Sequence, residues 1–171
     1  MTVTLEPWRR EFAPSIARYA DNPRVADNLR DIFPCPYALS DAEAYIEECL
    51  HTDDSRELRY AIVVDGEAAG SITVTPQADV YRHSAELGYW LGEPFWGRGI
   101  MTRAVRQACE EAFGRYDIVR IYAEPYAYNR GSRRVLEKAG FTLEGVLRQS
   151  VTKNGQLYDS CIYARLRGEG T

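Results

Sequence analysis

The sequence lacks the features that mark membrane and secreted proteins. No apolar run is long enough to cross a bilayer, and charged residues and a proline interrupt the first residues, MTVTLEPWRREF. We therefore expect neither a transmembrane segment nor a secretory signal. This predicts a cytoplasmic protein that has no membrane partner.

Cysteine and histidine are scarce, and they form no ligand pattern. No CxxC or CxxH pair exists, so a zinc site is not expected, and a chain of this size needs no disulfide framework. We predict no bound metal and four reduced thiols, mostly in the core: Cys35, Cys49, Cys109 and Cys161. His51 and His83 have no partner pattern and are expected at the surface, which argues against a Cys–His nucleophile.

The net charge of −4 hides an uneven distribution. Residues 1–97 hold 8 basic and 17 acidic residues, a net charge of −9, whereas residues 98–171 hold 13 and 8, a net charge of +5. The first part would attract cations and the second anions, unless these charges are simply dispersed over solvated surfaces. An acidic balance argues against a nucleic-acid partner, because such a domain needs a basic surface.

The first half of the chain reads as a strand, helices and a three-stranded meander. Val3–Leu5 is the first strand, and helical spacing over residues 13–33 is broken at Pro23. Ser40 and Glu43 form a capping-box pattern, which predicts a helix from Ser40 to about Leu50. Two strands then flank an Asp-Gly turn, and AELGYWL is the third strand; these strands are residues 59–64, 67–75 and 85–91.

The second half alternates helices and strands. A helix follows the segment FWGRGIMT to about Phe113, and a β-branched strand then ends at Pro125. The next helix has Asn129 as its N-cap and Gly140 as its C-cap, and a final hairpin turns at KNG. This order predicts an α/β or α+β single domain with a mixed sheet.

The segment FWGRGIMT places glycines where a helix must begin. The first amides of a helix have no intrahelical acceptors and lie at the positive end of its dipole. Gly97 and Gly99 let backbone approach a ligand closely, and Arg98 adds positive charge, so the segment suits a pyrophosphate. The alternative is a plain tight turn. Neither GxxxxGK[ST] nor GxGxxG is present.

A second segment, YNRGSRRVLEKAGF, forms a helix with two different sides. One side carries small and apolar residues and can face a buried ligand channel: Asn129, Ser132, Val135, Leu136 and Ala139. The other side carries cations, which either line the rim of that channel or form a solvated face: Arg130, Arg133, Arg134 and Lys138.

Together these segments resemble the GNAT N-acetyltransferases. FWGRGIMT is similar to the family's pyrophosphate loop, Q/R-x-x-G-x-G/A, and NRGSRRVLEKAGF to N-x-x-[SA]-x-x-x-[YL]-x-K-x-GF. AELGYWL, NRGS and the closing GxLR hairpin resemble the RimJ/RimL-type branch, which acetylates the N-termini of ribosomal proteins. The resemblance implies that residues 1–171 form a single acetyltransferase domain. Its mixed, mostly antiparallel central sheet would splay into a V, with helices on both faces.

The resemblance also implies a set of acetyl-CoA ligands. Trp96 stands where many members have Gln or Arg, and Gly99 matches the glycine of the motif. Arg133, Arg134 or Lys138 would meet the 3′-phosphate. The implied cofactor-binding residues are Trp90, Leu91, Trp96, Gly97, Arg98, Gly99, Ile100, Met101, Thr102, Asn129, Ser132 and Arg133.

Acetyl transfer to an amine needs a proton acceptor and a proton for the leaving thiolate. Glu86, just ahead of the loop, is the candidate base, directly or through a water; the alternative is a half-exposed strand residue. Many GNAT members have a tyrosine seven residues after the asparagine, and this tyrosine acts as the general acid. This chain has Leu136 at that position. Ser132 is the candidate substitute, with Tyr126 and Tyr128 as further options.

The pattern therefore predicts an acetyl-CoA-dependent N-acetyltransferase. The acceptor would be a protein N-terminus or a small amine, selected by residues 13–52 and the last hairpin, and the protein would be a monomer or a homodimer. One alternative is a non-catalytic acyl-CoA-binding or sensing module. Another is an ATP-binding enzyme, although nothing resembles its metal ligands.

Overall fold

The computed structural model describes residues 1–170. Its seven strands pair in the order β1-β2-β3-β4-β5-β7-β6. β4 and β5 are parallel, whereas β1 with β2, β5 with β7, and β6 with β7 are antiparallel, so the predicted mixed, mostly antiparallel sheet is confirmed. The strands are β1 (Val3–Glu6), β2 (Leu58–Val64), β3 (Glu67–Pro76), β4 (Ser84–Leu91), β5 (Arg120–Ala123), β6 (Thr142–Lys153) and β7 (Gln156–Leu166).

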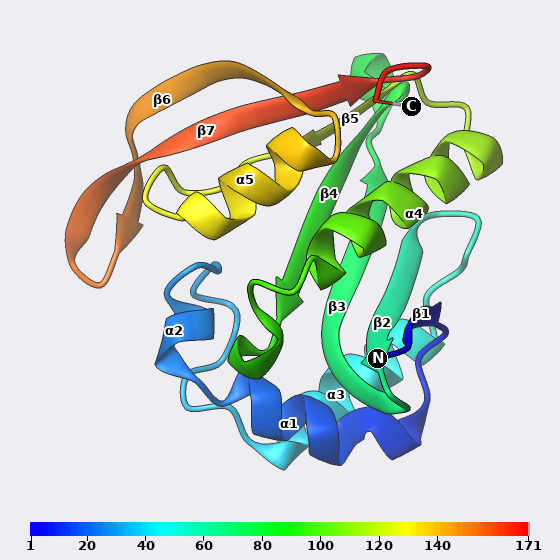
Figure 1. Ribbon diagram of the computed structural model, residues 1–171, viewed down its shortest axis with the longest axis vertical. Coiled ribbons are helices and arrows are strands. Elements are labelled where there is room, and N and C mark those ends of the chain that lie inside the picture. Colours follow the sequence, from blue (N-terminus) through cyan, green and yellow to red (C-terminus); the bar gives the residue numbers. More distant parts are fainter. Residues whose placement is uncertain (171) are drawn as a thin grey trace. The chain divides into compact units, whose positions relative to one another are not determined.

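The chain forms two compact units. The first contains Met1–Thr73 and Tyr89–Ile100, and the second contains Val74–Gly88 and Met101–Thr171. The α-helices are α1 (Ala13–Ala20), α2 (Pro23–Ala26), α3 (Leu39–Leu50), α4 (Ile100–Arg115) and α5 (Arg130–Lys138) (Figure 1).

The first unit is built around one hydrophobic cluster. Ile16 of α1, Ile46 of α3 and Ala68 of β3 are all buried in it. The β2–β3 turn has positive φ angles at both central residues, 49° at Asp65 and 84° at Gly66, as a type I′ hairpin turn requires. The hairpin predicted from the Asp-Gly pair is therefore confirmed.

The start of α3 differs from the prediction. The helix begins at Leu39, and the Asp41 carboxylate accepts a hydrogen bond from the Ala38 amide at 2.8 Å. Ser40 lies inside the first turn and is not the N-cap, so the predicted capping box with Glu43 is wrong. Asp41, at the third helical position, takes the role that the sequence assigned to Glu43, because its carboxylate reaches back to the N-cap amide beside the positive end of the helix dipole.

In the second unit, α4 and α5 lie over the same face of the sheet. Tyr163 of β7 bonds Arg133 and Glu137 of α5, each at 3.1 Å, and Arg165 bonds Glu110 of α4. Residues two apart on a strand project to the same side, so both helices contact one face of β7. Figure 1 shows α5 running along β7.

β5 is shorter than predicted and ends at Ala123 rather than near Pro125. The following segment continues to pair with β7 in a different way: the Pro125 carbonyl accepts from the Cys161 amide, and the Asp159 carbonyl accepts from the Ala127 amide. Pro125 has no amide hydrogen to extend a ladder, so the strand stops before it.

The other local predictions can be checked directly. The four thiols are unpaired, with Cys35 exposed and the other three buried, as expected. None of the described helices combines the length and apolar character of a membrane span.

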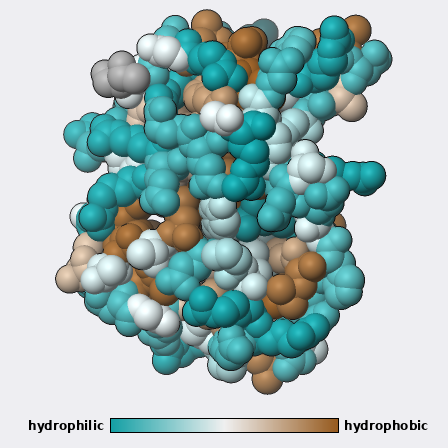
Figure 2. Space-filling view, turned by 90° about the vertical axis from the view of Figure 1, so that its right-hand side faces the viewer, coloured by the Kyte–Doolittle hydropathy of each residue, from teal (hydrophilic) through white to brown (hydrophobic). Residues whose placement is uncertain are grey.

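The face drawn in Figure 2 is mostly hydrophilic, with separate hydrophobic patches. Exposed apolar side chains of the second unit include Val146, Leu147, Leu157 and Leu166.

Candidate functional site

The residues predicted to form the site fall into two groups, one in each unit. The first unit holds the segment around the glycines: Trp90, Leu91, Trp96, Gly97, Arg98, Gly99 and Ile100. The second unit holds the helix starts and the candidate base: Glu86, Met101, Thr102, Asn129, Ser132 and Arg133.

The glycines of the loop have backbone angles in the left-handed region, which favours glycine. Gly97 has a φ of 72° and Gly99 a φ of 73°. A Cβ built on either residue would meet no heavy atom within 4 Å, so the space beside the backbone is open. The loop is therefore a cradle shaped by positive φ, with the charge of Arg98 between the two glycines.

Trp96 holds the start of this loop. Its indole Nε1 donates a hydrogen bond to the Leu91 carbonyl at 2.7 Å, while 38 % of the residue remains exposed. The Leu91 carbonyl is thus already engaged. The Trp90 carbonyl lies against the backbone of Gly70, where an added Cβ would come within 2.2 Å. Trp90 and Leu91 remain predicted contacts of a pantetheine arm.

Glu93 fastens the same loop to the segment between α1 and α2. Its carboxylate accepts from Asn22 Nδ2 at 2.6 Å and also pairs with Arg24. Asn22 caps α2 as well, because its Oδ1 accepts from the Arg24 amide at 2.9 Å. The ring of Phe95, two residues after Glu93, packs edge-on against Tyr19 at 5.0 Å between centroids.

The first turn of α4 follows the loop directly. Ile100 and Met101 are buried, with 1 % and 7 % of their surfaces exposed, and Thr102 is half-buried. The buried side chains fix the turn, while the first amides of a helix lack acceptors within it. Because its side chain is buried, Met101 has its backbone amide to offer a ligand.

Asn129 forms the predicted N-cap of α5. Its Oδ1 accepts from the Ser132 amide at 3.2 Å. The turn that carries Asn129 is bonded to β7, since the Ala127 amide donates to the Asp159 carbonyl at 2.9 Å. Asn129 and the half-buried Ser132 thus share the first turn of a helix whose position is fixed by a strand.

The Arg133 side chain bonds to other residues of the second unit. Its Nε donates to the Tyr163 hydroxyl and its Nη1 to the Ala127 carbonyl, both at 3.1 Å. The bond with Tyr163 raises the pKa of Arg133. Among the cations of α5, Lys138 and Arg134 are both exposed whereas Arg133 is half-buried, so the first two are better placed to reach a 3′-phosphate.

Glu86 lies in register with Tyr122, a residue that sequence reasoning missed. The two are Cα partners across the parallel β4–β5 pair, and both are half-buried. The parallel register runs from Ser84 to Glu86 and ends there. Ala85 and Ile121 are buried on the helix-covered face, so Glu86 and Tyr122 project to the other side of the sheet.

Comparison with known proteins identifies the family. The model of the acetyltransferase (GNAT) domain matches residues 2–142. The chain belongs to this family.

Two solved structures and one polyamine acetyltransferase are similar to the chain. RimJ of Mycobacterium smegmatis in complex with CoA-disulfide has a TM-score of 0.81 at 26 % identity, covering 96 % of this chain and 82 % of that one. The microcin C7 self-immunity acetyltransferase MccE, in complex with acetyl-CoA and AMP, has a TM-score of 0.81 at 25 % identity, covering 96 % and 92 %. Spermidine N(1)-acetyltransferase of Escherichia coli is 28 % identical over 169 residues, 95 % of this chain and 86 % of that one.

These likenesses agree with a GNAT N-acetyltransferase of the RimJ/RimL-like branch that uses acetyl-CoA. The seven-stranded sheet and its helices are those of the GNAT fold. Within residues 1–170, no three His, Cys, Asp or Glu side chains are grouped as metal ligands would be.

Leu136, which the resemblance predicts to stand where many GNAT members have a tyrosine, is fully buried. It contacts no solvent and has no titratable group, so it cannot supply a proton. Tyr126 and Tyr128 lie 5.7 Å apart between ring centroids, and Tyr158 lies 4.8 Å from Tyr128. These two tyrosines are therefore part of an aromatic cluster ahead of α5.

Proposed function

We propose that residues 1–171 act as one domain that transfers an acetyl group from acetyl-CoA directly to a primary amine. The observation that supports this most is the loop of Gly97 and Gly99, which have positive φ and open space beside the backbone. The loop leads into a helix of 16 residues, whose dipole favours a pyrophosphate at its start.

Residues of both segments would hold the cofactor. The loop amides, Arg98 and the Thr102 hydroxyl suit the pyrophosphate, and the cap of α5 at Asn129 suits the amide groups of pantetheine. Lys138 or Arg134 would pair with the 3′-phosphate. When bound, acetyl-CoA supplies an activated thioester, and the side chains orient it.

Glu86 is the proposed general base. The neutral amine nitrogen forms a bond to the thioester carbonyl carbon, the carbon–sulfur bond breaks, and Glu86 takes the proton lost by nitrogen, directly or through a water. Holding both reactants together removes the need for a covalent enzyme intermediate. The Ser132 hydroxyl would donate a hydrogen bond to the departing sulfur, which is finally protonated from solvent.

A non-catalytic acyl-CoA-binding module is the second candidate. It is favoured by one observation, the buried Leu136 in place of the GNAT tyrosine. Such a protein would keep the cradle and lack turnover.

The two candidates differ in the release of CoA. Purified protein would be mixed with acetyl-CoA and a panel of small amines, polyamines and N-terminal peptides, and the free thiol would be followed with a chromogenic disulfide. Acceptor-dependent thiol release supports the transferase. Tight acetyl-CoA binding by calorimetry without release for any acceptor supports the binding module.

A further inference from the structure

We infer that Arg133 and Tyr163 form a positioning pair, which holds the turn ahead of α5 in the shape that binds the pantetheine arm. This inference rests on the proposed binding of acetyl-CoA. Neither side chain would touch the cofactor, and both would act through Ala127 and Asn129. All four residues lie in the second unit.

The Tyr163 side chain is a fixed anchor in the sheet. Its backbone pairs with Ala123 of β5 on one side and with Leu143 of β6 on the other, and the residue is fully buried. Its hydroxyl donates to Glu137 Oε1 and accepts from Arg133 Nε, each at 3.1 Å. Burial raises the pKa of Tyr163, so the hydroxyl keeps the proton that it donates.

The Arg133 guanidinium joins this anchor to the turn. Its Nε donates to the Tyr163 hydroxyl while its Nη1 donates to the Ala127 carbonyl, both at 3.1 Å. Because a guanidinium is planar, its donors form a fixed fork, and the two bonds together set the orientation of the turn relative to β7. A lysine would not reproduce this geometry, since its donors share one nitrogen.

The bonds of Ala127 fix the backbone just ahead of Asn129. The Ala127 amide donates to the Asp159 carbonyl at 2.9 Å, and the Ala127 carbonyl accepts from Arg133. That carbonyl shares one rigid peptide plane with the Tyr128 amide, so the bond from Arg133 orients the peptide that leads into Asn129. β7 therefore holds the turn twice, once through its backbone and once through the positioning pair.

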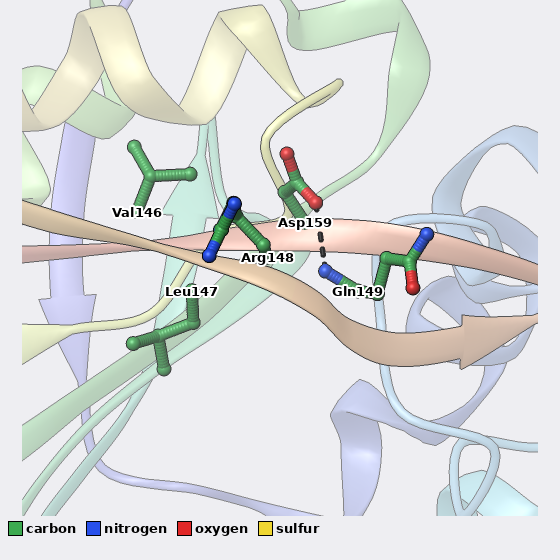
Figure 3. A pocket seen from close by; sticks show the side chains of 5 residues that line it. All are labelled: Val146, Leu147, Arg148, Gln149 and Asp159. Atoms are coloured by element: carbon green, nitrogen blue, oxygen red, sulfur yellow. Dashed lines mark hydrogen bonds between the residues drawn. The ribbon is translucent and has the colours of Figure 1, made fainter.

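The backbone attachment is itself supported by β6. The Asp159 carboxylate accepts from the Gln149 amide at 2.8 Å, where Gln149 has a φ of 53° (Figure 3). The two residues line an open pocket with Val146, Leu147 and Arg148. Substitutions at Arg133 or Tyr163 leave this attachment in place, so they isolate the contribution of the positioning pair.

The orientation of Asn129 decides which of its groups faces a ligand. Its Oδ1 accepts from the Ser132 amide at 3.2 Å, so Nδ2 is the group left to donate to a pantetheine carbonyl. Its φ of −79° and ψ of 76° lie outside the helical range. These angles are therefore set by the preceding turn and not by the helix.

The alternative is that Arg133 binds a cofactor phosphate directly. The structure favours positioning, because Nε and Nη1 of Arg133 already have acceptors within the protein. The two roles differ toward adenosine 3′,5′-diphosphate, which carries the 3′-phosphate of CoA but no pantetheine arm. A phosphate contact would strengthen the binding of both ligands, whereas positioning of Asn129 would strengthen the binding of CoA alone.

The test compares the affinities for CoA and for adenosine 3′,5′-diphosphate by calorimetry. Tyr163→Phe removes only the hydroxyl, and Arg133→Met removes both bonds but keeps an unbranched side chain. We expect each variant to lose about fivefold in affinity for CoA, the effect of one hydrogen bond, and less than about twofold for the diphosphate. Arg133→Lys, which restores the charge without the fork, should not recover the affinity for CoA.

Glu137→Ala is the matched control. It removes the other bond of the Tyr163 hydroxyl and should lower the melting temperature about as much as Tyr163→Phe does. It leaves the bond between Arg133 and Tyr163 in place, so the affinity for CoA should stay unchanged. An equal loss of CoA affinity in Glu137→Ala and Tyr163→Phe would attribute the effect to general destabilisation and overturn the inference.

The remaining outcomes separate this inference from the proposed function. Equal losses for both ligands in Arg133→Met, recovered in Arg133→Lys, would overturn positioning in favour of a phosphate contact. Unchanged CoA affinity in both Tyr163→Phe and Arg133→Met would also overturn it. Absence of CoA binding by the unsubstituted protein would instead overturn the proposed function. Arg133→Gln replaces Arg133→Met if that variant does not fold.

Discussion

The indole nitrogen of Trp96 donates a hydrogen bond to the carbonyl of Leu91 across 2.7 Å. This bond closes a short loop between the end of β4 and the Gly97–Gly99 cradle. The Trp96 amide also donates to the Glu93 carbonyl at 3.1 Å. A side chain that replaces the usual Gln or Arg of the motif thus acts on the shape of the cradle.

Trp96→Phe should weaken acetyl-CoA binding. Losing the indole bond costs about 1 kcal/mol, or roughly fivefold in Kd, if the bond pre-forms the cradle. Isothermal titration calorimetry measures this directly. Trp8→Phe is the matched control, because Trp8 Nε1 has no hydrogen-bond partner among the described residues. An equal loss of affinity in both variants would contradict the role of the Leu91 bond.

Gly99→Trp should abolish acetyl-CoA binding while the protein stays folded. An indole placed beside the backbone would fill the space proposed for the pyrophosphate. The free protein offers room for it, since a Cβ at Gly99 meets no atom within 4 Å. Gly155→Trp is the control with a similar φ, 76°, and equal space in the β6–β7 turn. Unchanged affinity in Gly99→Trp, with the melting temperatures of both variants compared, would refute the loop assignment.

Glu86→Gln should lower kcat and leave the affinity for acetyl-CoA unchanged. Removing a general base typically costs about 10² to 10⁴ in rate. Steady-state thiol release and calorimetry on the same preparation give the two quantities. Glu144→Gln is the control, because Glu144 is paired with Arg120 and has no proposed part in proton transfer. A loss of less than threefold in Glu86→Gln would remove this residue from the mechanism.

Tyr45→Phe should destabilise the first unit. The Tyr45 hydroxyl lies 2.9 Å from the Ser71 hydroxyl, and burial raises the pKa of Tyr45. Deleting the phenol oxygen leaves Ser71, 4 % exposed, without this partner, at a cost of about 1 to 2 kcal/mol. Urea unfolding measures the change. In the double variant with Ser71→Ala the cost should shrink, and simple additivity would show that the pair does not interact.

Only Cys35 should react with iodoacetamide in the native protein near pH 8. Cys35 is exposed, whereas burial raises the pKa of Cys109 to about 12 and also raises that of Cys49. Since the thiolate is the nucleophile, the raised pKa values keep Cys49 and Cys109 unreactive near neutral pH. Cys161 is buried, so the reagent does not reach it in the folded protein. Mass spectrometry should count one adduct in buffer and four in urea. Several adducts in buffer would contradict the buried core positions.

Turns and helix caps could be predicted from short sequence motifs. The Asp65–Gly66 turn and the Asn129 cap are decided within a few residues, and both are confirmed. The predicted start of α3 was wrong because Ser40–Glu43 and Ala38–Asp41 both have an acidic residue three positions after a possible N-cap, and the sequence does not show which register forms.

Contacts between residues far apart in the chain could not be predicted from the sequence. Tyr122 lies 36 positions after Glu86, and only the β4–β5 register shows that the two are neighbours. The sequence predicts Arg133 either at the rim of a ligand channel or on a solvated face, but its guanidinium bonds Tyr163, which is 30 residues away. The indole bond of Trp96 was also not predictable, because it depends on how β4 ends.

Glu93 limits how this protein could be recombined with its relatives. Its bonds to Asn22 and Arg24 join the cradle to the residues that open α2. A chimaera that imports residues 13–52 from another GNAT enzyme to gain a new acceptor would separate Glu93 from both partners. Chimaeras in which the imported segment keeps Asn22 and Arg24 at these positions should retain the bonds to Glu93 and an intact cofactor loop. Glu93, Asn22 and Arg24 should therefore be kept together in any exchange of segments.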